Sequence, residues 1–88
     1  MSPKASDLPV ELLEARGLYC PLPVIKTRER LKALPPGGRL DVIADDPLAP
    51  LDLQAFCSTE GHAYLGASDE PGGGWRMALR KSESAERP

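Results

Sequence analysis

The sequence contains few of the residues that build disulfide scaffolds and metal sites. It has two cysteines, one histidine and 5% aromatic residues. Small disulfide-stabilised domains usually carry more cysteines, and a zinc site needs a cluster of ligands. The single histidine, His62, cannot build a metal site alone. We therefore expect neither a disulfide framework nor a bound metal, and the sequence indicates no cofactor.

The sequence also lacks long apolar runs and an excess of basic charge. No stretch of about 18 apolar residues is present, so no transmembrane helix and no membrane partner are expected. The N-terminal MSPKASDLP has no apolar signal core, which favours a cytoplasmic protein with free thiols. The net charge is −2, from 11 basic and 13 acidic residues, whereas proteins that grip nucleic acid usually have a basic face. Direct binding to nucleic acid is therefore not expected.

Length and composition predict one domain. The chain has 88 residues, of which 41% are apolar and 27% charged, and these values are typical of a globular domain. Residues 1–9 are polar and interrupted by proline, and we expect a flexible lead-in there. Residues 82–88 are expected to form a disordered tail. The folded domain is therefore expected over residues 10–81.

Hydrophobic periodicity, glycine and proline predict six elements. In chain order we first expect a strand over 10–15, a helix after residue 20 that ends at the PPGG run 35–38, and a strand over 39–45. A second helix that ends at Gly61 should follow, and then strands over 62–67 and 75–81. The two helices can cover one face of the four strands. The predicted fold is an α/β (α+β) two-layer sandwich, βαβαββ, with a four-stranded mixed sheet and a final hairpin.

Proline marks the start of both helices. Pro21 and Pro23 are compatible with a first helical turn and incompatible with a helix interior. The second helix begins either after an Asp46 N-cap, or later, near Pro50. The apolar stripe of the first helix is expected to hold Val24, Leu31 and Leu34, with Ile25 at its edge. The apolar face of the second is expected to hold Ala49, Leu53, Phe56 and Cys57.

Cys20 occupies the most informative position in the chain. It follows the turn at Gly17 and comes directly before the first helix, with Arg16 and Lys26 near in sequence. Unpaired N–H groups and partial positive charge at a helix N-terminus lower the pKa of a cysteine, and the thiolate is the nucleophilic form. A structural cysteine is the alternative, since free cysteine is commonly buried. The position in a loop favours a reactive thiol for Cys20, and the apolar helix face favours a structural role for Cys57.

Two motifs resemble those of the TusA (SirA/YedF) family of sulfur carriers, and particularly its TusA branch. The stretch EARGLYCPLPVIKTRERL matches the family's Gly-Leu-x-Cys-Pro-x-Pro signature at Gly17, Leu18, Cys20, Pro21, Pro23 and Lys26. The stretch DDPLAPLDLQAFCSTEGHAYL resembles the family's second motif at Asp46, Pro47, Asp52, Phe56, Gly61 and His62. The sequence departs from the family at Glu14, where aspartate is common, and at Pro50, inside the second helix. The resemblance covers roughly residues 10–81.

The resemblance implies a sulfurtransferase-like persulfide carrier rather than a turnover enzyme. Cys20 would accept persulfide sulfur from a cysteine desulfurase and pass it to a downstream relay protein, for 2-thiolation of the wobble uridine of tRNA. Relatives in the family serve sulfur oxidation or molybdenum-cofactor synthesis, and these roles remain alternatives. Gly17, Pro21 and Pro23 would shape the site. Arg16, Lys26 and Arg30 are either docking residues for an acidic partner surface or plain solvated charges.

Two other functions are compatible with the residues. One is a regulatory or interaction module that does not use persulfide chemistry. The other is a thiol redox protein, which requires the Cα atoms of Cys20 and Cys57 to approach within roughly 4.4–6.8 Å. Nothing in the sequence requires an oligomer, so a monomer is expected.

Overall fold

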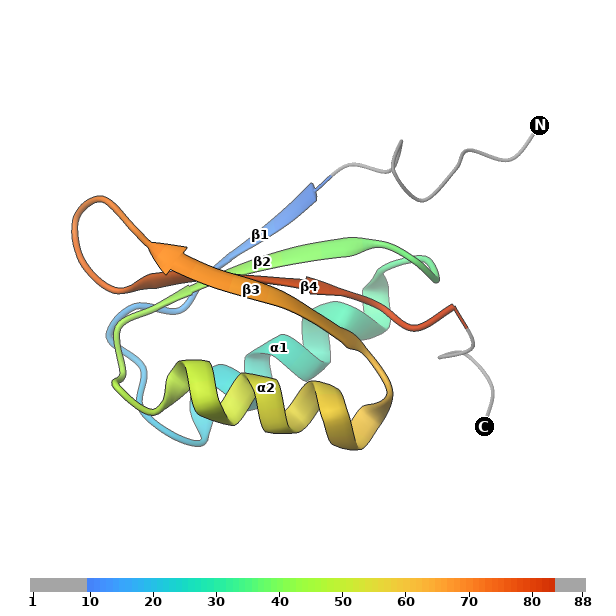
Figure 1. The fold of residues 1–88 in the computed structure, drawn as a ribbon, viewed down its shortest axis with the longest axis horizontal. Helices are drawn as coiled ribbons and strands as arrows, with labels where there is room; N and C mark the ends of the chain where they lie inside the picture. Colours follow the sequence, from blue (N-terminus) through green and yellow to red (C-terminus); the bar gives the residue numbers. More distant parts are fainter. Residues whose placement is uncertain (1–9, 84–88) are drawn as a thin grey trace.

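The computed structural model describes residues 10–83, which form a four-stranded sheet with both helices packed beneath one face (Figure 1). The elements are β1 (Val10–Glu14), α1 (Leu22–Ala33), β2 (Arg39–Ala44), α2 (Ala49–Glu60), β3 (Ala63–Asp69) and β4 (Trp75–Arg80). The predicted βαβαββ order and the two-layer sandwich are confirmed. The predicted lead-in over 1–9, and residues 84–88 of the predicted tail, lie outside the described residues.

The sheet is mixed, with the strand order β1-β2-β4-β3. β1 pairs with β2 in parallel, as expected for strands joined by a helical crossover. β4 lies between β2 and β3 and runs antiparallel to both, which confirms the final hairpin. It follows that β1, β2 and β3 all run in one direction. The two crossover helices therefore also run parallel to each other, and their N-termini meet at one end of the molecule (Figure 1).

The core lies between the helices and the two central strands. Alternate residues of β2 and β4 point toward the helices and are fully buried, namely Leu40, Val42, Met77 and Leu79. Leu53, Phe56 and Cys57 of α2 pack against them, as the sequence predicts. Strand periodicity of two and helix periodicity of three to four together explain which side chains form this layer.

The buried face of α1 differs from the predicted stripe. Its buried residues are Pro23, Thr27 and Leu31, which are spaced one turn apart. Val24 and Leu34 are only partly buried, although they pack against the core, and Ile25 is exposed. Pro23 starts the helix and Thr27 is polar, so hydrophobicity alone does not predict that these two residues face the core.

α2 begins at Ala49, so the later of the two predicted starts is confirmed and the Asp46 N-cap is wrong. Pro50 lies in the first turn, where its missing N–H removes no helical bond. The Asp46 side chain instead accepts a 3.0 Å hydrogen bond from the Leu48 N–H, before the helix begins. Gly61 ends α2 in a left-handed conformation with φ of 83°, as predicted.

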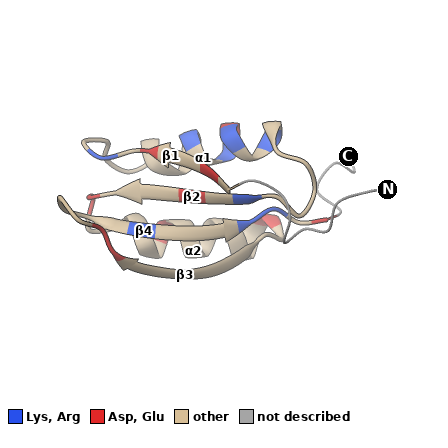
Figure 2. Cartoon of the chain, turned by 90° about the horizontal axis from the view of Figure 1, so that it is seen from above, with Lys and Arg blue, Asp and Glu red and all other residues tan. Residues whose placement is uncertain are grey.

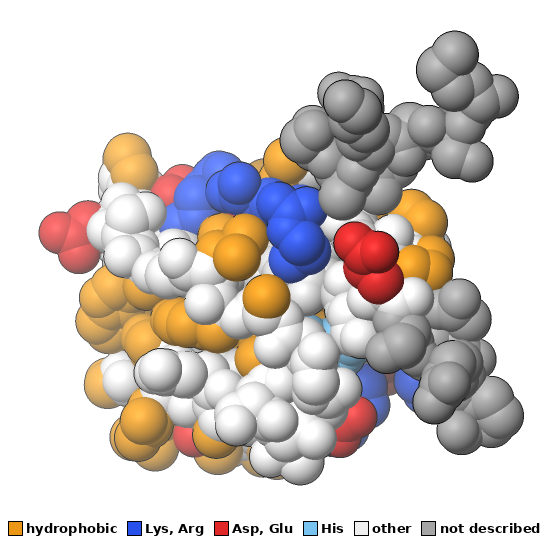
Figure 3. All heavy atoms as spheres, turned by 45° about the vertical axis from the view of Figure 1, so that its right-hand side comes forward, with side chains coloured by type: hydrophobic (Ala, Val, Ile, Leu, Met, Phe, Trp, Pro, Cys, Tyr) orange, Lys and Arg blue, Asp and Glu red, His pale blue; other side chains and the backbone are white. Residues whose placement is uncertain are grey.

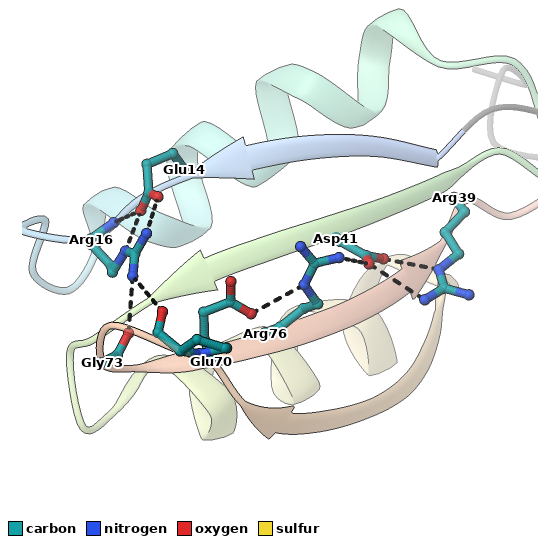
Figure 4. Close-up of polar contacts among 8 residues, drawn as sticks. Glu14, Arg16, Arg39, Asp41, Glu70, Gly73 and Arg76 are labelled. Atoms are coloured by element: carbon teal, nitrogen blue, oxygen red, sulfur yellow. Dashed lines mark hydrogen bonds and ion pairs between the residues drawn. The ribbon is translucent and has the colours of Figure 1, made fainter.

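A buried carboxylate organises the open face of the sheet. Asp41 is 2% exposed and lies between two arginines, with its oxygens 2.9 Å from Arg39 Nε and 3.0 Å from Arg76 Nη1. Arg76 also contacts Glu70 at 3.3 Å (Figure 4). The network joins β2 to β4 and compensates the burial of the Asp41 charge.

Candidate functional site

Cys20 lies in the loop between β1 and α1, and a residue 26 positions later in the sequence fixes it there. The Cys20 backbone N–H donates a 2.7 Å hydrogen bond to Oδ2 of Asp46, which is itself only 6% exposed. Upstream in the same loop, the N–H of Gly17 donates to Oδ1 of Asp45 at 2.9 Å. Gly17 has φ of 87°, a conformation that favours glycine. The Asp-Asp pair after β2 therefore anchors the cysteine loop at two points.

The two prolines flank the start of α1. Pro21 is the N-cap residue and Pro23 is the second residue of the helix, where it is buried. The peptide bond between Cys20 and Pro21 is cis. The side chain of Cys20 remains exposed at the end of the molecule where both helices begin. The placement of Cys20, Pro21 and Pro23 relative to the helix agrees with the sequence-based interpretation.

The electrostatic surroundings of the thiol differ from those predicted. The pKa of Cys20 is raised, chiefly because its side chain is hydrogen-bonded to the carboxylate of Asp52, and further by partial desolvation and by the charges of Asp52 and Asp46. Asp52 lies in the first turn of α2. The prediction of a lowered pKa considered only the N-terminus of α1. It missed the two carboxylates that the start of α2 brings to the same place.

Four large apolar side chains that are near Cys20 in sequence, or near the aspartates that contact it, are exposed. Tyr19 and Leu22 adjoin it in sequence and are 69% and 43% exposed. Leu48 and Leu51, which neighbour the aspartates that contact Cys20, are 53% and 66% exposed. A cluster of large exposed apolar residues around one position commonly marks an interaction surface. These four residues are called the apolar rim below.

The three predicted docking residues differ in how firmly they are held. Arg16 is bound to Glu14 at 2.7 Å, and its Nη1 lies 3.4 Å from the carbonyl oxygens of Pro71 and Gly73 in the β3–β4 hairpin (Figure 4). Arg30 donates to the Leu12 carbonyl at 2.8 Å and so ties α1 to β1. Lys26 has only a 4.0 Å contact with Glu29.

Lys26 is therefore the member of this trio best able to meet a partner. It is one of four basic residues of α1, with Arg28, Arg30 and Lys32, and Figure 2 shows basic side chains along that helix. Arg16 and Arg30 have structural contacts that a partner would have to share or displace.

Cys57 and His62 both lie away from the thiol chemistry. Cys57 is 1% exposed, and burial raises its pKa to about 11. Both cysteines are free. His62 accepts a 3.0 Å hydrogen bond from the Ser82 N–H at Nδ1, and its ring lies 5.7 Å from that of Phe56. The structural roles expected for these two residues agree with their surroundings.

Two absences apply to residues 10–83. No group of three or more histidine, cysteine, aspartate or glutamate side chains is arranged to hold a metal ion there. No helix in this part of the chain is long and apolar enough to cross a membrane.

Comparison with known proteins identifies the family. The family model described as Sulfurtransferase TusA matches residues 11–81. The chain belongs to the TusA family. The sulfur carrier protein TusA of Pseudomonas savastanoi is 41% identical over 73 residues, which are 82% of this chain and 87% of that protein. The TusA of Pseudomonas fluorescens is 39% identical over 67 residues, covering 75% of this chain and 81% of the relative.

Two further proteins are similar to this chain, one in sequence and one in fold. YrkF of Bacillus subtilis, a candidate sulfur carrier protein, is 43% identical over 59 residues; these are 67% of this chain and only 32% of YrkF. The crystal structure of a SirA-like protein from Desulfitobacterium hafniense superposes with a TM-score of 0.72 at 22% identity, covering 85% of this chain and 100% of the other. That likeness supports the TusA-family fold.

Proposed function

We propose that this protein carries sulfur as a persulfide on Cys20. A cysteine desulfurase presents a persulfide, and the Cys20 sulfur attacks its terminal sulfur atom. The new S–S bond forms on Cys20 while the donor's S–S bond breaks. The donor cysteine leaves as a thiolate and takes up the proton that the Cys20 thiol releases. An acceptor cysteine on a relay protein then removes the sulfur in the same way, most directly for 2-thiolation of the tRNA wobble uridine.

The observation that carries the proposal is the exposed thiol inside the apolar rim of Tyr19, Leu22, Leu48 and Leu51. A thiol that transfers sulfur from one protein to another needs an exposed position and a surface on which each partner can dock. Gly17, Pro21 and Pro23 fix the loop that presents it. Membership of the TusA family, whose relatives are named as sulfur carriers, supports the same function.

The proposal includes the surroundings in which the carrier works. It acts in the cytoplasm as a monomer, with protein partners and without gripping nucleic acid itself. The net charge of −2 supports this last point. Lys26, and less readily Arg16 and Arg30, would meet acidic residues of a partner. A basic partner residue beside Asp52 would neutralise the charge that raises the pKa of Cys20 and so activate the thiol.

Intact mass spectrometry without reductant tests the carrier chemistry. The protein is incubated with an active cysteine desulfurase and cysteine. We expect a gain of one sulfur atom that a thiol reductant reverses. Cys20→Ser should not gain sulfur, whereas Cys57→Ala, the matched control at the buried cysteine, should load like the wild type. Loading that persists in Cys20→Ser contradicts the proposal.

The biological role is tested in cells from which the gene for this protein has been deleted. The wild-type gene should restore 2-thiouridine in tRNA, and Cys20→Ser should not. Restoration by Cys20→Ser would favour an interaction module that needs no persulfide. Sulfur loading without any effect on tRNA thiouridine would instead favour the sulfur-oxidation or molybdenum-cofactor roles.

A further inference from the structure

Two cavities lie along the seam between α1 and α2, and one of them contains Cys20. These adjoining cavities, of about 340 and 320 Å³, share Arg28, Phe56 and Glu60. The first cavity contains Cys20 and Val24 from the beginning of α1, and the second contains Leu31 and Lys32 from its end. Since the two helices run parallel, the cavities lie end to end. Together they form what we call the interhelical groove.

The floor of the interhelical groove is apolar along its length. Val24 and Ala55 line the half beside the thiol, and Leu31 lines the other half. Phe56 lies at the junction, where the guanidinium of Arg28 stands 5.5 Å above its ring. An elongated groove with apolar side chains in both halves fits an extended polypeptide segment.

The charges in the groove are unequally distributed between its two ends. Asp52 stands beside Cys20 at the first end. Lys32 and Lys81 line the second end, opposite a single carboxylate, Glu60. Figure 3 shows His62, in pale blue, recessed at this end with basic and acidic side chains close by. His62 accepts a hydrogen bond from Ser82, Lys81 donates to the Leu34 carbonyl at 2.6 Å, and Arg28 lies over Phe56. Among residues 10–83, Lys32 is the cation of this cavity without such a contact.

We propose that the interhelical groove binds an extended segment of the protein that exchanges sulfur with Cys20, with a cysteine at the Asp52 end and a carboxylate at the Lys32 end. The proposal rests on the proposed carrier function. From Leu22 to Lys32 the helix rises about 15 Å, and an extended chain covers that length in about five residues. The recognised segment therefore carries an acidic residue about five positions from its reactive cysteine, in either chain direction.

Synthetic peptides test this spacing directly. Each peptide contains one cysteine, blocked as a mixed disulfide with thionitrobenzoate, and one aspartate. The aspartate is placed one, three, five or eight positions from the cysteine, on either side. All other residues are glycine or serine. Cys20 attacks the peptide sulfur and forms a new disulfide with it. The peptide–thionitrobenzoate bond breaks, the coloured thionitrobenzoate leaves with the electron pair, and buffer takes the Cys20 proton. The rate constant at low salt is compared with that of the matching asparagine peptide.

We expect the aspartate at five positions to raise the rate constant roughly two- to fivefold, the range of one exposed ion pair. An aspartate next to the peptide cysteine should lower the rate constant, because Asp52 repels that aspartate. Lys32→Gln should abolish the gain at five positions. Arg80→Gln removes one positive charge from β4, outside the groove and outside the proposed docking residues, and should keep the gain. Reaction with the symmetrical thionitrobenzoate disulfide should be alike in both variants.

A rate constant that does not depend on the aspartate position overturns the groove proposal, and so does an equal loss of the gain in Arg80→Gln and Lys32→Gln. If desulfurase loading of Cys20 is intact in either case, only the groove proposal fails. If the spacing preference is found but Cys20 never loads with sulfur, the groove binds acidic cysteine segments and the carrier function fails.

Discussion

The buried carboxylate of Asp46 accepts a 2.7 Å hydrogen bond from the backbone N–H of Cys20, 26 residues earlier in the chain. The same carboxylate accepts a 3.0 Å hydrogen bond from the Leu48 N–H. One side chain therefore fixes the loop that leads into α1 and the loop that leads into α2. The relative position of the thiol and of Asp52, one turn into α2, depends on this connection.

Replacing Asp46 by alanine should destabilise the protein by about 2–4 kcal/mol. Two backbone donors lose a charged acceptor in a largely buried position, and such hydrogen bonds contribute about 1.5–3 kcal/mol each. Urea unfolding measures the change. Asp45→Ala is the matched control, because Asp45 is exposed and accepts one bond, from Gly17. It should cost about 1 kcal/mol. Equal losses in the two variants would contradict the central role of Asp46.

Replacing Asp52 by asparagine should lower the pKa of Cys20. The hydrogen bond to Asp52 is the largest cause that raises this pKa, ahead of desolvation and of the charge of Asp52, and removing that carboxylate favours the thiolate. At a fixed pH below the pKa, a larger thiolate fraction reacts faster. The pH dependence of alkylation by iodoacetamide measures the shift, and the rate at pH 7.5 should rise.

Asp69→Asn is the control for that measurement, since Asp69 is an exposed residue at the end of β3, outside the groove. An alkylation profile that is the same in Asp52→Asn and Asp69→Asn would show that Asp52 does not govern the thiol.

Replacing Asp41 by alanine should cost about 2–3 kcal/mol. The change leaves Arg39 and Arg76 close together without the carboxylate that separates them. Both arginines are more than a third exposed and can regain water, so the loss should fall below that of a fully buried pair. Glu70→Ala removes the other partner of Arg76 and should cost less than about 1 kcal/mol. A thermal or urea midpoint unchanged in Asp41→Ala would contradict this account.

Protonation of His62 should weaken the fold. Its pKa is lowered by burial and by Lys81, although Glu60 opposes the shift. Because the folded pKa is below that of the unfolded chain, the unfolded state binds the proton more tightly. The stabilisation is therefore complete above the ordinary histidine pKa of about 6.5 and is lost as pH falls through the folded pKa.

Urea unfolding at pH 7.5 and 5.5 measures this loss. His62→Gln keeps an acceptor for the Ser82 N–H and removes the titration, so its stability should change less between the two pH values. The prediction is contradicted if the wild type loses no more stability between pH 7.5 and pH 5.5 than His62→Gln does.

The order of strands and helices could be predicted because each carries its own local signal. Alternation in β2 and β4, proline at the helix starts and Gly61 at the end of α2 all act over a few residues. The position of Cys20 just before α1 follows from the same local signals. The signature around it matched a family, and that match carried the function.

The surroundings of the thiol could not be predicted in the same way. Asp46 is an ordinary helix-cap residue in sequence, and only the fold brings it to the Cys20 N–H. Asp52 raises the pKa of Cys20 because two parallel helices begin side by side, which depends on the sheet order. Thr27 is buried although it is polar, and no apolar stripe would include it. Contacts between residues distant in sequence decided each of these points.

The place of β4 in the sheet has a consequence for synthesis on the ribosome. This strand is the last of the six described elements along the chain, yet it lies between β2 and β3 and contributes the buried Met77 and Leu79 to the core. Until residues 75–80 leave the exit tunnel, β2 has an unpaired edge and β3 has no partner strand. The sheet therefore cannot be completed until β4 has been synthesised, and until then the nascent domain exposes a strand edge that can pair with other chains.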